Sequence, residues 1–295
     1  MRVLILGGGG TLGAFSAGAL AALDEGQFQP DAIIGSSAGG INLLRWTVGG
    51  AEEAIRFWKE NAHLRTILRG LVHGKNWSEG ILDPDWFRAR VEDGVDFDLL
   101  ARDRRMLSFL VLDMETGRVS VRGNRTEPSP EALRAVSRGA YALPPLLPPV
   151  SHGKMLLADG GLLHNAPLQA AVKLGATSIV YVCNVHAIPR AGFRRRSSIG
   201  SAWRYAEIFF RRASNVGFVD ADIVDGRFRG VPFLVIAPPA NLGFGSLLRR
   251  MVPRIDAVQH LVDTGYECAG RAYSQWLDHE ATSGLLSVRE TPSLA

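Results

Sequence analysis

The residues best suited to chemistry in this sequence are the five letters GSSAG at positions 35–39. They match the pattern GxSxG, with Gly35 and Gly39 framing Ser37 at its centre. In hydrolases this pattern makes a sharp turn between a strand and a helix, which lifts the serine hydroxyl out of the sheet. The positive N-terminal end of the following helix then faces the hydroxyl. We therefore predict that Ser37 is a nucleophile.

A second glycine-rich stretch, GGGTLG, lies between the apolar run VLIL and an alanine-rich segment. Consecutive backbone N–H groups at the start of a helix stabilise the oxyanion of an acyl-transfer intermediate. We expect Gly8, Gly9 and Gly10 to supply these donors, with Gly13 completing the motif. Loops that follow successive parallel strands open at the same edge of a sheet, so these glycines are predicted to lie beside Ser37.

The same six letters also match GxGxxG, the fingerprint of dinucleotide-binding folds. That function requires an acidic residue about 20 positions later, at the end of the second strand, to bind a ribose. Asp31 stands at the start of that predicted strand, and Gly35 occupies its end. A non-catalytic nucleotide-binding module that uses Gly8–Gly13 is therefore the alternative to the hydrolase interpretation.

A serine nucleophile needs a base that accepts its proton. Asp159 follows the apolar run MLLA and precedes Gly160 and Gly161, which let the chain turn closely. We predict that Asp159 lies at a strand end facing the site; a plain Asp-Gly-Gly turn is the alternative. A conventional Ser-His-Asp carboxylesterase would instead need His164 or His186, which fall near predicted loops.

Apolar runs and helix-like segments alternate around these motifs. Short buried strands are predicted at 3–6 and 31–37, and helices at 14–26 and after position 38. This alternation predicts a parallel sheet. Further along, we expect a strand, a Thr-Gly turn and a return strand in 105–123, and then a helix that Ser129 caps and Pro130 begins. A strand, a turn, a helix and a second strand are expected in 155–185. The last expected elements are a strand at 231–239 and a helix at 256–277.

The length of 295 residues and the hydrophobic content of 46% suffice for one large core. We predict an α/β fold, a three-layer α/β/α sandwich with a mainly parallel central sheet, as one domain over residues 1–280. An arginine-rich insertion is expected at about 190–230. Residues 281–295 have no periodic pattern and are predicted to be a disordered tail.

Composition excludes several classes of function. The net charge of +4 is small and scattered along the chain, which gives no indication of a nucleic-acid partner. Cys183 and Cys268 are the only cysteines, and neither belongs to a CxxC pair, so the sequence predicts no disulfide framework and no structural zinc site.

The start of the chain has one basic residue and a four-residue apolar run before the glycines, which is too short for a signal peptide. We therefore expect a cytoplasmic protein. The segments 199–217 and 244–254 mix arginines with apolar residues, and 199–217 has the spacing of a basic amphipathic helix. Such a helix can rest on anionic lipid, so peripheral contact at the inner membrane surface is a second expectation.

Taken together, the three glycine motifs resemble those of the patatin-like phospholipase family. GGGxxG comes first, GxSxG follows about a helix later, and Asp-Gly-Gly begins 122 positions after Ser37. The stretch SRGAYALPPLLPPV is similar to the family's alanine-rich Pro-Pro segment, and ADGGLLHNAPLQAAVKLGA to its Asp-Gly-Gly, Asn, Pro helix entry. The resemblance extends from Val3 to about Val185.

This resemblance implies a serine-aspartate dyad that hydrolyses fatty-acyl esters of phospholipids or lysophospholipids, with no histidine, metal or cofactor. Ser37 matches the nucleophile, Asp159 the general base, and Gly8–Gly10 the oxyanion loop. One residue departs from the pattern, because family members usually have Arg or Lys where this chain has Leu12. A catalytically silent relative that binds lipid or a partner protein is therefore a further alternative.

Overall fold

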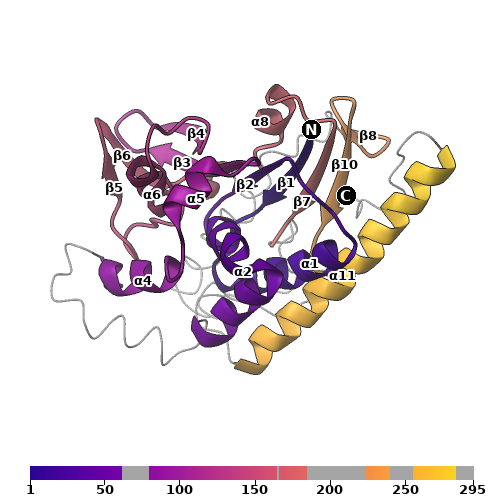
Figure 1. Ribbon diagram of the computed structural model, residues 1–295, viewed down its shortest axis with the longest axis horizontal. Coiled ribbons are helices and arrows are strands. Elements are labelled where there is room, and N and C mark those ends of the chain that lie inside the picture. The colour runs from indigo at the N-terminus through magenta and orange to yellow at the C-terminus, as the bar shows by residue number, and fades with distance from the viewer. Residues whose placement is uncertain (62–79, 165, 185–222, 240–254, 284–295) are drawn as a thin grey trace, which may run out of the picture.

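A computed structural model describes residues 1–61, 80–164, 166–184, 223–239 and 255–283 (Figure 1). Most of the arginine-rich insertion expected at 190–230 lies outside the described residues. So do both predicted lipid-contacting segments, and so does the tail beyond residue 283.

The centre of the sheet consists of five parallel strands. Their order is β3 (Met106–Asp113), β2 (Ala32–Gly35), β1 (Arg2–Leu6), β7 (Ser178–Val182) and β10 (Val231–Ile236). The central strands are almost wholly apolar, as is typical of parallel sheets that are buried on both faces. The predicted parallel centre is confirmed.

Both flanks of the sheet are antiparallel. On one side, β4 (Arg118–Gly123), β6 (Met155–Asp159) and β5 (Val150–His152) extend from β3. On the other side, β9 (Arg227–Phe228) and β8 (Ile223–Val224) extend from β10. Strands β5, β8 and β9 were not predicted from the sequence, because two or three residues are too few to show an alternating pattern.

Successive side chains of β1 enter two different cores. Leu4 and Leu6 belong to one buried cluster, and Val3 and Ile5 to another. This division follows from the period of two along a strand, which sends neighbouring side chains to opposite faces of the sheet.

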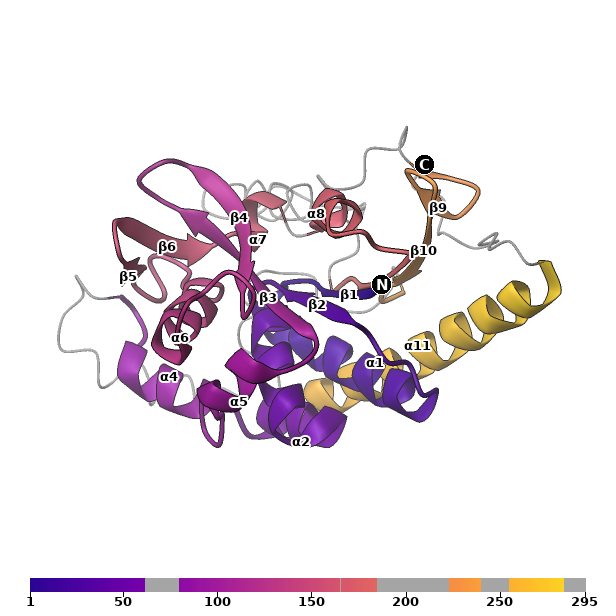
Figure 2. The same cartoon turned by 45° about the horizontal axis from the view of Figure 1, so that its top comes forward.

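Helices cover the two faces of the sheet (Figure 2). On the face of Leu4, α1 (Gly13–Glu25) packs between α2 (Ala38–Asn61) and α11 (Ile255–Ser283). On the face of Val3, α8 (Leu168–Lys173) contributes buried apolar residues. The described residues therefore form the predicted three-layer arrangement.

Close helix packing explains the small residues of α1. A Cβ at Gly18 would lie 1.9 Å from the carbonyl oxygen of Val262, and one at Gly265 would lie 2.0 Å from that of Phe15. Glycine on both helices thus lets α1 and α11 approach backbone to backbone. This contact fixes α1, whose first turn follows the glycine-rich loop.

Three helices form a lobe beside β3: α4 (Pro84–Val91), α5 (Phe97–Arg102) and α6 (Pro130–Gly139). Helix α6 begins as predicted, since the Ser129 hydroxyl accepts a hydrogen bond from the N–H of Ala132 at 3.2 Å.

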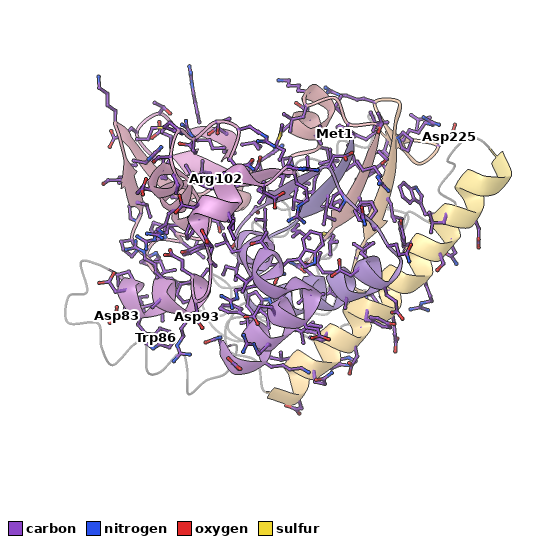
Figure 3. The ribbon with its side chains drawn as sticks, viewed as in Figure 1. Met1, Asp83, Trp86, Asp93, Arg102 and Asp225 are labelled. Carbon is purple, nitrogen blue, oxygen red and sulfur yellow. The ribbon has the colours of Figure 1, made fainter. Side chains whose placement is uncertain are left out.

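Asp83 caps α4 in the same way by accepting hydrogen bonds from the N–H groups of Asp85 and Trp86. Figure 3 shows Asp83 and Trp86 at the outer side of the lobe. Within the described ranges, no helix combines the length with the apolar composition that crossing a bilayer requires.

Candidate active site

Ser37 lies in the turn between the end of β2 and the start of α2. Its φ of 51° is a left-handed conformation, which is strained for a residue with a side chain. Hydrogen bonds on both sides of the residue hold this conformation. The N–H of Ser37 donates to the carbonyl of Ala140 at 2.8 Å, and the N–H of Gly40 donates to the carbonyl of Ser37 at 2.9 Å. The side chain of Ser37 is partly exposed at this turn.

Backbone contacts explain the two glycines that frame the serine. A Cβ at Gly39 would lie 1.9 Å from the carbonyl oxygen of Leu6, the last residue of β1. A Cβ at Gly35 would lie 2.7 Å from the Cα of Gly40, in the first turn of α2. No other residue type fits these positions without moving the backbone. The turn is therefore pressed against the end of β1, where the glycine-rich loop begins.

The glycine-rich loop follows β1 at the same edge of the sheet as Ser37. Gly8 and Gly9 are buried and Gly10 is exposed, and a short 3-10 helix, η1 (Gly10–Leu12), leads into α1. Gly10 has a φ of 62°, which favours glycine.

The loop carries backbone donors without a partner. Within the described part of the chain, the N–H groups of Gly9 and Gly10 donate to no acceptor. The same is true there of the N–H of Ala38, the residue after Ser37. In α/β-hydrolases the residue after the nucleophile and a neighbouring loop together supply the oxyanion donors. Ala38 was not among the donors predicted from the sequence.

Asp159 is the last residue of β6, and it is 2% exposed. One carboxylate oxygen, Oδ1, accepts a hydrogen bond from the N–H of Gly161 at 2.8 Å. The hydroxyl of Ser37 also hydrogen-bonds to this carboxylate. Gly160 lies close to β3, since a Cβ there would lie 3.0 Å from the backbone of Val111, which is closer than most Cβ contacts.

Strand β3 explains how Ser37 and Asp159 meet. Along one edge it pairs with β4, and along the other it pairs first with β2 and then with β6. Gly35 pairs with Phe109, and Asp159 pairs with Val111. The chain leaves the sheet after Gly35, at the turn that contains Ser37. Strand β6, which runs antiparallel to β3, pairs with the next part of the same edge of β3. The two strand ends therefore face each other across about two residues of β3, or about 7 Å.

A short segment after α6 contacts both Ser37 and Asp159. The carbonyl of Ala140 accepts from the N–H of Ser37, and the carbonyl of Ala142 accepts from the N–H of Asp159, each at 2.8 Å. This stretch is part of the family resemblance, but its residue types predict no contact with Ser37 or Asp159. Backbone carbonyls leave no signal in the residue types, so only the fold reveals this contact.

Burial raises the pKa of Asp159 from its usual 3.8 to about 7, and the hydrogen bonds from Ser37 and from the N–H of Gly161 offset only part of this effect. A carboxyl group with this pKa exchanges protons near neutral pH. It is therefore suited to accept a proton from Ser37 and return it later.

The two alternative uses of these motifs find less support in the geometry. Asp31 precedes β2 and accepts a hydrogen bond from the N–H of Arg2 at 2.7 Å, so it lies at the edge of the sheet opposite the glycine-rich loop. It cannot bind a ribose there. His164 ends α7 (Gly161–His164), and burial lowers its pKa. Within the described residues Ser37 bonds to Asp159, and not to His164. His186 lies outside them.

The described residues contain no group of three or more His, Cys, Asp or Glu side chains that could hold a metal ion. Leu12, where the resemblance leads one to expect a cation, is 5% exposed and packs into the core beneath the loop.

Several solved structures are similar to this chain. VipD from Legionella pneumophila is 15% identical, with a TM-score of 0.47, and the match covers 93% of this chain and 67% of VipD. The type III effector ExoU is 12% identical, with a TM-score of 0.45, over 92% of this chain and 52% of ExoU. The present chain thus spans about half the length of ExoU. No curated protein matches the sequence.

The family comparison concerns the part of the chain that contains all three glycine motifs. Residues 4–172 match the family model described as patatin-like phospholipase. This match covers more than half of the sequence and includes the positions of Ser37 and Asp159. The chain therefore belongs to the patatin-like phospholipase family.

Proposed function

We propose that this protein is a serine acyl hydrolase that cleaves fatty-acyl ester bonds of phospholipids or lysophospholipids. Ser37 is the nucleophile and Asp159 is the general base. The observation that carries the proposal is the hydrogen bond from the Ser37 hydroxyl to the buried Asp159 carboxylate. Membership of the family supports the class of substrate.

The first half of the reaction is acylation of the serine. Oγ of Ser37 attacks the ester carbonyl carbon while its proton passes to the carboxylate of Asp159. The C–O bond to the lipid alcohol then breaks, and the alcohol leaves with the proton from Asp159. The product at this stage is an acyl ester of Ser37.

Negative charge develops on the carbonyl oxygen during this step. The N–H groups of Gly9, Gly10 and Ala38 lack other acceptors within the described residues, and they follow the two strand ends that meet at Ser37. Fixed backbone donors of this kind stabilise an oxyanion more than they stabilise the neutral ester. We assign the oxyanion site to them, with Gly8 as part of the same loop.

The second half of the reaction releases the fatty acid. Water attacks the acyl carbon, and Asp159 accepts a proton from that water. The bond to Oγ breaks, Ser37 recovers its proton from Asp159, and the free enzyme is restored. The same carboxyl group therefore serves both halves, which requires a pKa close to the working pH.

The substrate of such an enzyme is presented on a membrane surface. We extend the proposal to peripheral contact of a cytoplasmic protein with the inner membrane surface through the arginine-rich segments 199–217 and 244–254. Their mixture of arginines and apolar residues supports this assignment. Flotation with anionic and with neutral vesicles tests it, and absence of binding to both kinds would contradict it.

Labelling with a fluorophosphonate, followed by peptide mass spectrometry, tests the catalytic proposal. We expect label on Ser37 in the wild type and in Ser36→Ala, the matched control at the neighbouring serine. Ser37→Ala is expected to remain unlabelled and Asp159→Asn to react very slowly. His164→Ala should react as the wild type does.

Hydrolysis of a phospholipid and of a lysophospholipid by the same variants identifies the substrate. Turnover that survives Ser37→Ala, or labelling of Asp159→Asn at the wild-type rate, would refute the proposed dyad. Loss of labelling in His164→Ala would instead favour the conventional triad.

A further inference from the structure

Both ends of the glycine-rich loop are held by a buried asparagine. Nδ2 of Asn184 donates to the carbonyl of Gly7 at 2.7 Å. Nδ2 of Asn42 donates to the carbonyl of Gly13 at 2.8 Å. The two asparagines are 1% and 0% exposed, respectively. The segment between these anchors contains all the glycines assigned to the oxyanion loop.

Each asparagine is itself oriented by a second hydrogen bond. The hydroxyl of Ser16 donates to Oδ1 of Asn184 at 2.6 Å, and Nε1 of Trp58 donates to Oδ1 of Asn42 at 2.6 Å. These bonds fix which end of each amide faces the loop, because the Oδ1 end must accept and the Nδ2 end must donate.

The four side chains come from three elements that surround the loop. Asn184 follows β7, Ser16 lies on α1, and Asn42 and Trp58 lie on α2. Helix α2 begins directly after Ser37. The bond from Asn42 therefore connects the loop with the helix that directly follows Ser37.

A run of glycines needs such support for a physical reason. Glycine loses more conformational freedom on folding than any other residue, and it has no side chain that could anchor the loop. Leu12 packs into the core and offers no polar contact. An oxyanion site depends on donors that are already in place when charge develops. In this chain the buried amides supply the missing polar anchors.

We propose that Asn42 and Asn184 are positioning residues that hold the backbone N–H groups of the glycine-rich loop in register with Ser37. This inference rests on the proposed function, since it assumes that the loop receives the oxyanion. It assigns to each asparagine an effect on the transition state and not on binding of the substrate.

The variants Asn184→Ala and Asn42→Ala test the proposal. We expect each to lower kcat by about 10- to 100-fold, the loss that a displacement of about 1 Å causes in a positioned group. KM should change little, because the oxyanion donors act on charge that the bound ester does not yet carry. The affinity for a trifluoromethyl ketone, which forms an oxyanion adduct, should fall by the same factor as kcat.

Asn124→Ala is the matched control. Asn124 is 9% exposed, its Oδ1 accepts from the N–H of Leu107 at 3.0 Å, and its Nδ2 donates to the carbonyl of Arg105 at 2.9 Å. These bonds lie at the start of β3, away from Ser37. This variant should lose stability as the other two do, while kcat below its melting temperature stays at the wild-type value.

A double-mutant cycle tests whether Ser16 affects kcat through its hydrogen bond to Asn184. The hydroxyl of Ser16 bonds to Asn184, so the double variant Ser16→Ala, Asn184→Ala should have the kcat of Asn184→Ala alone. Hydrogen exchange of the peptide that covers residues 7–13 should be faster in Asn184→Ala and Asn42→Ala and unchanged in Asn124→Ala.

The outcomes distinguish this inference from the proposed function. If the wild type turns over substrate through Ser37 but both asparagine variants keep its kcat, as Asn124→Ala does, the positioning role is wrong and the dyad stands. If the wild type shows no turnover that depends on Ser37, the proposed function fails, and the positioning role fails with it. A selective loss of kcat with unchanged KM supports both.

Discussion

Two buried carboxylates, those of Asp159 and Glu127, lie in very different surroundings. Asp159 accepts hydrogen bonds from a hydroxyl and a backbone N–H. Glu127, which follows β4, instead pairs with a cation, since Nε of Arg122 lies 2.7 Å from its Oε1. Nε2 of His152 lies 2.9 Å from the other oxygen, Oε2.

The difference shows what a cation does to a buried carboxylate. Burial raises the pKa of both groups, but the Arg122 guanidinium and the hydrogen bonds from His152 and Thr126 hold the pKa of Glu127 below its ordinary value. Among the described residues no cation lowers the pKa of Asp159, and its two hydrogen bonds offset burial only in part, so its pKa rises to about 7. A paired carboxylate stays charged and stabilises the fold, whereas an unpaired one is available for proton transfer.

The largest expected difference between Asp159 and Glu127 is the effect of their substitution on kcat. We expect Asp159→Asn to lower kcat by about 10²- to 10⁴-fold, the usual contribution of a general base. The control Glu127→Gln should leave kcat unchanged, because Glu127 bonds to a different set of residues. Steady-state kinetics on folded protein compare them; a similar loss of kcat in both variants would show that the distinction between them is wrong.

The pH dependence of stability should have opposite signs at the two positions. Asp159 has a folded pKa above its unfolded value of 3.8, so its stabilising contribution is complete below pH 3.8 and is lost as the pH rises to about 7. At about 1.4 kcal/mol per pKa unit, Asp159→Asn should gain about 4 kcal/mol over the wild type across this range.

The folded pKa of Glu127 is lowered, so its contribution is present above its unfolded value of 4.5 and is lost as the pH falls. The stability of Glu127→Gln relative to the wild type should therefore decrease as the pH rises. Urea unfolding at several pH values measures both trends, and trends of the same sign would be incompatible with this account.

The rate of the wild-type enzyme should also follow the pKa of Asp159. Because the base must be deprotonated, kcat/KM should fall about tenfold per pH unit below pH 7 and be level above it. Glu127→Gln should keep the same midpoint. A profile that is level down to pH 5 would show that another group accepts the proton from Ser37.

The smallest effect is expected for His152, one of the hydrogen-bond partners of Glu127. His152→Ala removes one hydrogen bond from Glu127 but leaves Arg122 in place. We expect a loss of about 0.5–1.5 kcal/mol in the free energy of unfolding and no change in kcat. Thermal and urea unfolding measure the loss. A decrease as large as that in Glu127→Gln would mean that His152, and not Arg122, stabilises the carboxylate.

Much of the fold follows from short-range patterns in the sequence. The apolar runs predicted β1, β2, β3 and β10, and the serine-proline pair predicted the start of α6, because strand burial and helix capping depend on neighbouring residues. The non-helical dihedral angles of α2 at Gly49 and Gly50 are also a local effect, since glycine adopts such angles readily.

Long-range pairing could not be predicted in this way. The sequence predicted that Asp159 lies at a strand end. It did not predict that β6 runs antiparallel to β3 beyond the end of β2. The contacts of Ala140 with Ser37, and of Asn184 with Gly7, join residues far apart in the chain. Nothing in the letters around an alanine or an asparagine indicates a partner more than 100 residues away.

Because β2 and β6 pair with the same edge of β3, the number of β3 residues between the two pairings sets the separation of Ser37 and Asp159. One residue inserted between Phe109 and Val111 would shift Asp159 by about 3.3 Å and turn its side chain to the opposite face. An insertion beside Gly117 or Gly153, where nothing lies within 4 Å of an added Cβ, would leave that count unchanged. β3 thus sets the distance between Ser37 and Asp159 through the number of its residues and not through the side chains that it carries.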